Sequence, residues 1–218
     1  SAALTSLTIA QNPIGAPGAK ILAESFASSF LQWITIGSKF TRIPVHNTEI
    51  TSLNVSDQKL GPSEAIIVGG AIQFSAALTS LTIAQNPIGE RGATALVEAL
   101  KSSNMQSIVI GKDLRLIIRG ELESASLDAS NQDISPGYAI IMAWWLTLPV
   151  SAALTSLTID STGDMRNQEV YTLTAGEQTL DLSRKILGPA DAKLLSKWMQ
   201  RPEVSAALTS LTLDQNGG

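Results

Sequence analysis

Apolar residues recur along this chain in a short pattern, L-x-x-L-x-L, in which apolar and polar positions alternate at the end. Leu4, Leu7 and Ile9 form one copy, and eight further copies, some degenerate, begin at positions 31, 50, 78, 105, 124, 154, 177 and 208. Successive side chains of a strand point to opposite faces, so this alternation is typical of a short, half-buried strand. The pattern therefore predicts nine strands.

Helical patterns follow five of these strands, with apolar residues at spacings of three and four that place them on one helix face. The expected helices are Gly18–Phe30, Ser63–Phe74, Gly92–Leu100, Gly137–Leu146 and Ala190–Trp198. A helix that crosses between two strands allows those strands to be parallel. The segments 31–50 and 105–124 are too short for a helix and alternate instead, which predicts an extended excursion or a small hairpin.

A longer repeat contains these units. The block Ser-Ala-Ala-Leu-Thr-Ser-Leu-Thr begins at positions 1, 75, 151 and 205, at spacings of 74, 76 and 54 residues. A single unit cannot bury its apolar face, so neighbouring units must stack. Asn12 and Asn86 follow the strands at a point where a side-chain amide can bond the backbone of the turn.

The segment Leu78–Leu100, LTSLTIAQNPIGERGATALVEAL, resembles the ribonuclease-inhibitor type of leucine-rich repeat, and Leu4–Leu22 is similar to it. The resemblance implies an α/β solenoid with a curved parallel sheet of about nine strands on the concave side and about five helices on the convex side. It also implies protein binding. We expect one solenoid domain over residues 1–218, with no polar capping unit at either end.

Composition narrows the function. Charged residues make up 16% of the chain, the net charge is −4 and basic residues are scattered, which argues against nucleic-acid binding. The absence of cysteine excludes disulfides and, with no visible signal peptide, favours an intracellular location. No apolar stretch reaches the roughly 18 residues of a membrane span. His46 is the only histidine, so we expect no metal, cofactor or catalytic site.

Candidate partner-binding residues lie on the exposed strand face and in one helix. That face is mostly Ser, Thr and Gln, which also simply suits a half-exposed sheet. Adjacent helix positions are about 100° apart, so one of two neighbouring tryptophans must point at least partly outward, although both could still pack against neighbouring segments. The candidates are Gln32, Trp33, Thr35, Asn54, Asp128 and Asp181 on strands, and Trp144 and Trp145 in a helix.

Loops on a regular scaffold often carry recognition, so the tips of the irregular units are further candidates. They lie near Lys39–Asn47, Lys112–Gly120 and Thr162–Gly176. The sequence thus predicts a non-enzymatic protein-interaction scaffold, for example an accessory subunit of a larger complex. The alternative is a designed or self-associating structural repeat protein without a natural ligand, joined end to end. A more distant alternative is ice or surface binding through the Thr-rich strands.

Overall fold

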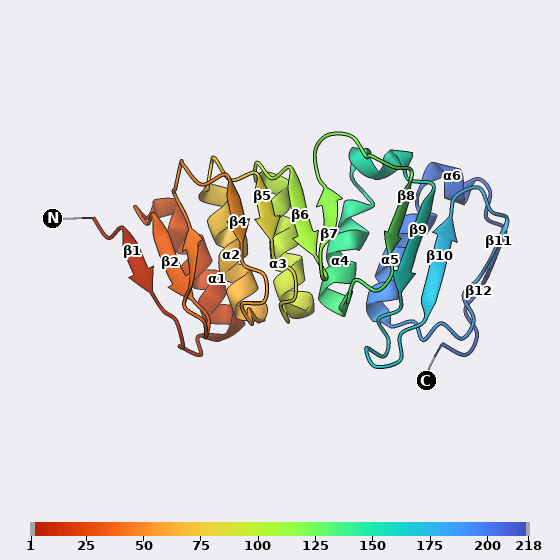
Figure 1. The fold of residues 1–218 in the computed structure, drawn as a ribbon, viewed down its shortest axis with the longest axis horizontal. Coiled ribbons are helices and arrows are strands. Elements are labelled where there is room, and N and C mark those ends of the chain that lie inside the picture. Colours follow the sequence, from red (N-terminus) through yellow and green to blue (C-terminus); the bar gives the residue numbers. More distant parts are fainter. Residues whose placement is uncertain (1–2, 217–218) are drawn as a thin grey trace. The chain divides into compact units, whose positions relative to one another are not determined.

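A computed structural model describes residues 3–216 of the chain, which divides into two compact units, Ser1–Ile110 and Gly111–Gly218. The described residues form an α/β protein with six α-helices and twelve strands (Figure 1). The α/β class is therefore as predicted. The expectation of a single domain over 1–218 stays a prediction.

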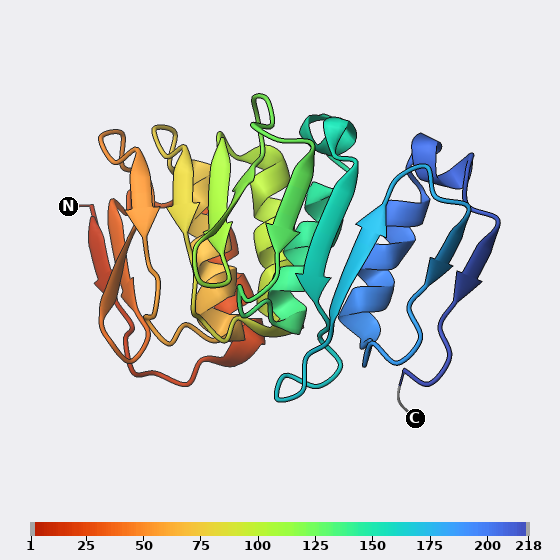
Figure 2. The same cartoon turned by 45° about the vertical axis from the view of Figure 1, so that its right-hand side comes forward.

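Unit 1 alternates strands and helices. In chain order it contains β1 (Ser6–Thr8), α1 (Gly15–Ser25), a short 3-10 turn (Phe26–Ser28), β2 (Trp33–Ile36), β3 (Thr41–Pro44), β4 (Ser52–Asn54), α2 (Pro62–Phe74), β5 (Ser80–Thr82), α3 (Gly89–Ser102) and β6 (Ser107–Ile110). The helix α2 packs between α1 and α3, and the three helices lie side by side along one side of the strands (Figure 1 and Figure 2).

Unit 2 follows the same plan. It contains β7 (Leu114–Ile117), β8 (Ser126–Ala129), α4 (Pro136–Trp145), a 3-10 turn (Pro149–Ala153), β9 (Ser156–Asp160), β10 (Val170–Thr174), β11 (Thr179–Asp181), α5 (Pro189–Met199), α6 (Pro202–Ser205) and β12 (Ser210–Thr212). Here α4 packs against α5.

All nine predicted strands are present, as β1, β2, β4, β5, β6, β8, β9, β11 and β12. The five predicted helices are confirmed as α1 to α5, and each begins one to three residues before its predicted start. The remaining strands β3, β7 and β10 lie in the irregular segments, and the four-residue helix α6 was not predicted.

The prediction of one continuous parallel sheet is wrong, because the described strands form four small sheets. Parallel pairing holds between β1 and β2, from β4 through β5 to β6, between β8 and β9, and between β11 and β12. In contrast, β3 pairs antiparallel with β2, and β10 pairs antiparallel with β9. A strand has two edges, so each hairpin partner takes the edge that the next parallel strand would need. For residues 31–50 the sequence predicts an extended excursion or a small hairpin, and the structure shows the hairpin.

The core of each unit lies between strands and helices. The inward strand residues Ile34, Leu81 and Ile108 are fully buried, and so are the helix residues Ile72 and Leu96 that face them. Burying apolar side chains of this size contributes roughly 1.5–3 kcal/mol each, so successive repeats within a unit stabilise one another.

Asn86 joins two successive repeats of unit 1. Its buried side-chain nitrogen donates hydrogen bonds to the carbonyls of Ile83 and Val55, at 2.9 and 2.8 Å. Its oxygen accepts hydrogen bonds from the backbone nitrogens of Gln58 and Leu60, at 3.0 and 2.9 Å. The expected amide-to-turn bond is confirmed here and at Asn12, and Asn86 also reaches into the neighbouring repeat.

Candidate functional site

Trp33 lies on the outward face of the β2–β3 hairpin. Ile34 and Ile43 point into the core, and strand alternation therefore places Trp33, Thr35 and Arg42 on the opposite face. Thr35 pairs directly with Arg42 across the hairpin. Sequence reasoning singled out Trp33 and Thr35 but missed Arg42.

The guanidinium of Arg42 stacks on the half-buried Trp33 ring, with its carbon 3.9 Å from the ring centroid. This is a cation–π contact, in which the cation is attracted to the negative face of the ring. Arg42 is exposed and forms no ion pair within residues 3–216, so its charge remains available to a partner. The contact holds the Arg42 guanidinium against the outward face of the hairpin.

Small hydroxyl side chains surround this pair. Ser6 and Thr8 of β1 lie beside Trp33 and Thr35 in the parallel register, and both are exposed. Gln32 is half-buried and is fixed through its backbone, which donates to the carbonyl of Thr5 at 2.8 Å. The structure thus brings Gln32, Trp33 and Thr35 together with Arg42, as an aromatic and cationic centre with a polar rim.

Asn54, Asp128 and Asp181 lie elsewhere, at the ends of β4, β8 and β11. They occupy equivalent positions of the repeat, and each side chain accepts a hydrogen bond from the backbone nitrogen two residues later, at 3.0, 2.9 and 2.9 Å. The donors are Ser56, Ser130 and Ser183. Hydrogen bonds from the hydroxyl and the backbone nitrogen of the serine lower the pKa of Asp128, and likewise of Asp181.

These three side chains therefore build the turn that leaves each strand. The signal was present in the sequence as Asn or Asp followed two residues later by Ser. The alternation of the strand predicts an exposed strand position for these side chains, whereas in the structure they form turns.

The two helical tryptophans differ in exposure. Trp145 is 1% exposed, and its indole nitrogen donates a 2.7 Å hydrogen bond to the carbonyl of Ile117. Trp144 is half-buried, so the expectation that one of the pair points at least partly outward is confirmed. Trp145 holds unit 2 together and does not reach the surface.

The tips of the irregular units also differ from one another. Phe40 is 55% exposed at the first tip, whereas Thr162 is buried at the start of the third. His46, the only histidine, is half-buried, with its Nε2 2.8 Å from the carbonyl oxygen of Phe26. The residues of these loops therefore range from buried to exposed.

A buried carboxylate in unit 2 was also missed. One oxygen of Asp191 accepts hydrogen bonds from the backbone nitrogens of Thr162 and Gly188, at 2.8 and 2.7 Å, and from the Thr162 hydroxyl. The other oxygen accepts one from the Tyr171 hydroxyl at 2.9 Å. Burial, and then the nearby Asp191 carboxylate, raises the pKa of Tyr171 well above its usual value. The network satisfies Asp191 fully and anchors the start of α5.

Within residues 3–216 no three histidine, aspartate or glutamate side chains come together in a way that could hold a metal ion. None of the helices in this part of the chain combines the length and apolar character needed to cross a membrane. No protein-family model matches the chain, and no curated protein sequence matches it either.

Proposed function

We infer that this chain is a non-enzymatic, protein-binding scaffold of the leucine-rich-repeat type, and that its exposed strand face binds a partner protein through Trp33 and Arg42. The observation that carries this inference is the stacked, half-exposed Trp33–Arg42 pair on an otherwise small and hydroxyl-rich face. Tryptophan and arginine dominate binding energy at protein interfaces, especially when a polar rim surrounds them.

The solenoid part of this proposal is supported by repetition within each unit. In unit 1, β4, β5 and β6 pair in parallel, α2 and α3 pack together, and Asn86 bonds two successive repeats. This combination matches the repeat that the segment Leu78–Leu100 resembles. The hairpins at β3 and β10 interrupt the sheet, so the proposed solenoid is a discontinuous one.

The charge of Arg42 indicates the chemistry of the partner. It has no carboxylate partner within residues 3–216, and a carboxylate placed against a stacked guanidinium forms a strong, charge-assisted hydrogen bond. We therefore expect the partner to offer an acidic residue beside an apolar or aromatic one, which would cover the Trp33 ring.

A displayed library of random peptides, selected on the full chain, tests this function. We expect enriched peptides to carry Asp or Glu, and to bind Trp33→Ala and Arg42→Ala at least tenfold more weakly than the unchanged protein. Arg166→Ala, which removes an exposed arginine of unit 2, is the matched control and should leave affinity unchanged. Enriched peptides that bind Trp33→Ala as tightly as the unchanged protein would contradict the proposal.

A further inference from the structure

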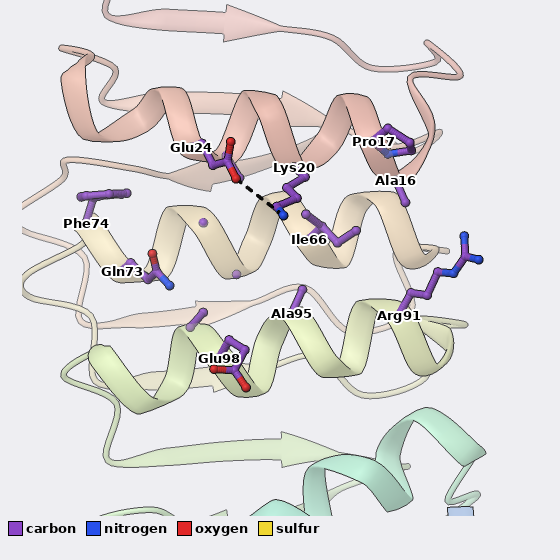
Figure 3. A pocket seen from close by; sticks show the side chains of 14 residues that line it. Ala16, Pro17, Lys20, Glu24, Ile66, Gln73, Phe74, Arg91, Ala95 and Glu98 are labelled. Carbon is purple, nitrogen blue, oxygen red and sulfur yellow. Dashed lines mark ion pairs between the residues drawn. The ribbon is translucent and has the colours of Figure 1, made fainter. Parts of the chain in front are cut away.

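The outward side of α2 is hollow. Ile66, Gly69, Gly70 and Gln73 lie at spacings of three and four and share one face of this helix. Side chains of α1 and α3 border that face, and together the three helices enclose a groove of about 640 Å³ (Figure 3). Grooves of this size accept several apolar side chains.

The hollow follows from close helix packing. A Cβ atom added to Gly70 would lie 2.5 Å from the Cβ of Ala23 on α1. One added to Gly69 would lie 3.3 Å from the carbonyl oxygen of Ala95 on α3. The glycines thus let α1 and α3 approach α2, and the same glycines leave no side chains on its outer face. Because packed backbone forms its floor, the groove exists before any ligand binds, which lowers the cost of binding.

Charges are separated along the groove. Arg91 lies at the end where the helices begin, whereas Glu24 and Glu98 lie toward the end where they finish (Figure 3). Lys20 and Glu24 form only a loose ion pair, at 3.9 Å, and Arg91 has no ion pair within the described residues, whereas Glu98 pairs with Lys101 of the same helix at 2.6 Å. The helix dipoles add positive potential at the first end and negative potential at the second.

The positive end and the negative end of the groove together indicate which kind of molecule would bind there. A fatty acid could place its carboxylate beside Arg91, but it has no cation for Glu24 at the other end, where the only ion pair of Glu24 within residues 3–216 is the loose one with Lys20. A helix commonly carries acidic residues in its first turn and basic residues in its last, where they stabilise its own dipole. The lining of α1 from Ala16 to Glu24 spans roughly 12 Å, or about two helical turns. An apolar face at positions i, i+3, i+4 and i+7 covers that length.

We propose that this groove binds an amphipathic α-helix of a partner protein. The helix lies parallel to α2, with its acidic first turn beside Arg91 and its basic last turn beside Glu24 and Glu98. Its apolar face fills the space above Gly69 and Gly70. The site lies among the helices of unit 1 and shares no residue with the Trp33 face, so it does not depend on the function proposed above.

Two synthetic peptides test the proposal on the full chain. Both have 12 residues, acetylated and amidated ends and the same apolar face; one carries Glu in the first turn and Lys eight residues later in the last turn, about 12 Å away as the groove requires, and the other exchanges them. Fluorescence anisotropy of labelled peptide measures affinity. We expect the first peptide to bind about tenfold more tightly, since the second brings like charges together at both ends. Equal affinities, or no binding at millimolar peptide, would overturn the proposal.

Variants locate the binding in the groove. Ala95→Trp places a large ring over the floor and should weaken binding of the first peptide at least tenfold, whereas Ala192→Trp, at an exposed alanine of α5, should not. Arg91→Glu should narrow the difference between the two peptides or reverse it. Unchanged binding to Ala95→Trp, or displacement of the first peptide from the groove by laurate at micromolar concentration, would instead assign the groove to another ligand and reject a helix.

Discussion

Units 1 and 2 contain the same kind of repeat, but they carry different residues at equivalent positions of their helices. Gly69 and Gly70 of α2 correspond, 74 residues later, to Ala143 and Trp144 of α4. In α2 these positions leave a groove, whereas in α4 a half-buried tryptophan occupies the outward position. The same helix positions thus leave a groove in unit 1 and carry a large side chain in unit 2. Distinctive surface features of this chain therefore arise where the residues of one repeat differ from those of its counterpart.

A second difference concerns how the repeats are joined. In unit 1 the neutral amide of Asn86 bonds the neighbouring repeat. At the equivalent position of unit 2, 76 residues later, Thr162 donates hydrogen bonds from its backbone nitrogen and its hydroxyl to the buried Asp191 carboxylate, at 2.8 and 2.7 Å, and Tyr171 donates to the same carboxylate. The joint of unit 1 thus uses a neutral amide, whereas the joint of unit 2 includes Tyr171, whose raised pKa makes the stability of the folded chain depend on pH.

The largest expected effect on stability comes from the tryptophans of α4 in unit 2. Trp145→Ala should lower the free energy of unfolding of unit 2 by about 3–5 kcal/mol, because it removes a fully buried ring and leaves the Ile117 carbonyl without its donor. Trp144→Ala should cost less than about 1 kcal/mol, since that ring is only half-buried. Urea unfolding followed by circular dichroism measures both. Similar losses from the two variants would contradict the assignment of Trp145 as the structural one.

The second-largest effect should appear at alkaline pH, where Tyr171 should make unit 2 lose stability. The pKa of Tyr171 is raised in the folded chain, so unfolding is favoured once pH exceeds its ordinary value of about 10, where only the unfolded chain loses the proton. Stability from this group is complete below pH 10 and falls by about 1.4 kcal/mol by pH 11.

Urea unfolding at pH 9 and pH 11 checks this prediction. Both tyrosines of the chain, Tyr138 and Tyr171, belong to unit 2, so unit 1 has no tyrosine to titrate. Tyr171→Phe should remove the part of the loss that comes from this group, about 1.4 kcal/mol at pH 11. An alkaline loss that is undiminished in Tyr171→Phe would show that another group is responsible.

A smaller effect should come from the glycines under the groove. Gly70→Ala should destabilise unit 1 by about 1 kcal/mol, because the clash with Ala23 outweighs the gain in helix propensity. Gly69→Ala has more room and should change stability by less than about 0.5 kcal/mol. Urea unfolding compares the two. A Gly70→Ala variant as stable as the unchanged protein would mean that α1 moves freely away from α2, and would weaken the description of a rigid groove.

Much of the fold could be predicted from sequence because each repeat is locally consistent. The strand at Leu78 and the helix that follows it carry their own periodicity, so their existence did not depend on distant contacts. The division into four sheets could not be predicted in the same way. It depends on which edge of β2 the strand β3 occupies, and alternation of apolar residues says nothing about the choice of partner.

The candidate sites were less predictable. Trp33 stood out by residue type, but Arg42 becomes its partner only through hairpin register. The groove depends on Gly69 and Gly70 meeting alanines of two other helices, and glycines within an apolar run ordinarily lower confidence in a helix. Residues that act by lacking a side chain leave little signal in a single sequence.

The smallest effect should appear at acidic pH. It concerns the turns that follow the strands, which carry an amide side chain in unit 1 and a carboxylate in unit 2. Asn54 ends β4 in unit 1, whereas in unit 2 Asp128 is the second-last residue of β8 and Asp181 ends β11. Hydrogen bonds from serine lower the pKa of both aspartates in the folded chain. Their contribution is therefore present above the ordinary aspartate value of about 3.9 and is lost as pH falls through the lowered values. Both carboxylates are exposed, so the loss should be small.

Replacing both aspartates by asparagine copies the turn of unit 1 into unit 2. Asn54 shows that an amide oxygen accepts the same bonds from Ser56, at 3.0 Å to the backbone nitrogen and 2.6 Å to the hydroxyl. The double variant Asp128→Asn, Asp181→Asn should therefore equal the unchanged protein at pH 7 and lose less stability between pH 4 and pH 2.5. Thermal unfolding at the two pH values measures the difference, with Asp164→Asn as control for a lowered carboxyl pKa in a loop outside these turns. If the double variant were clearly less stable at pH 7, the negative charge itself would matter, and the turns of the two units would differ in more than their response to pH.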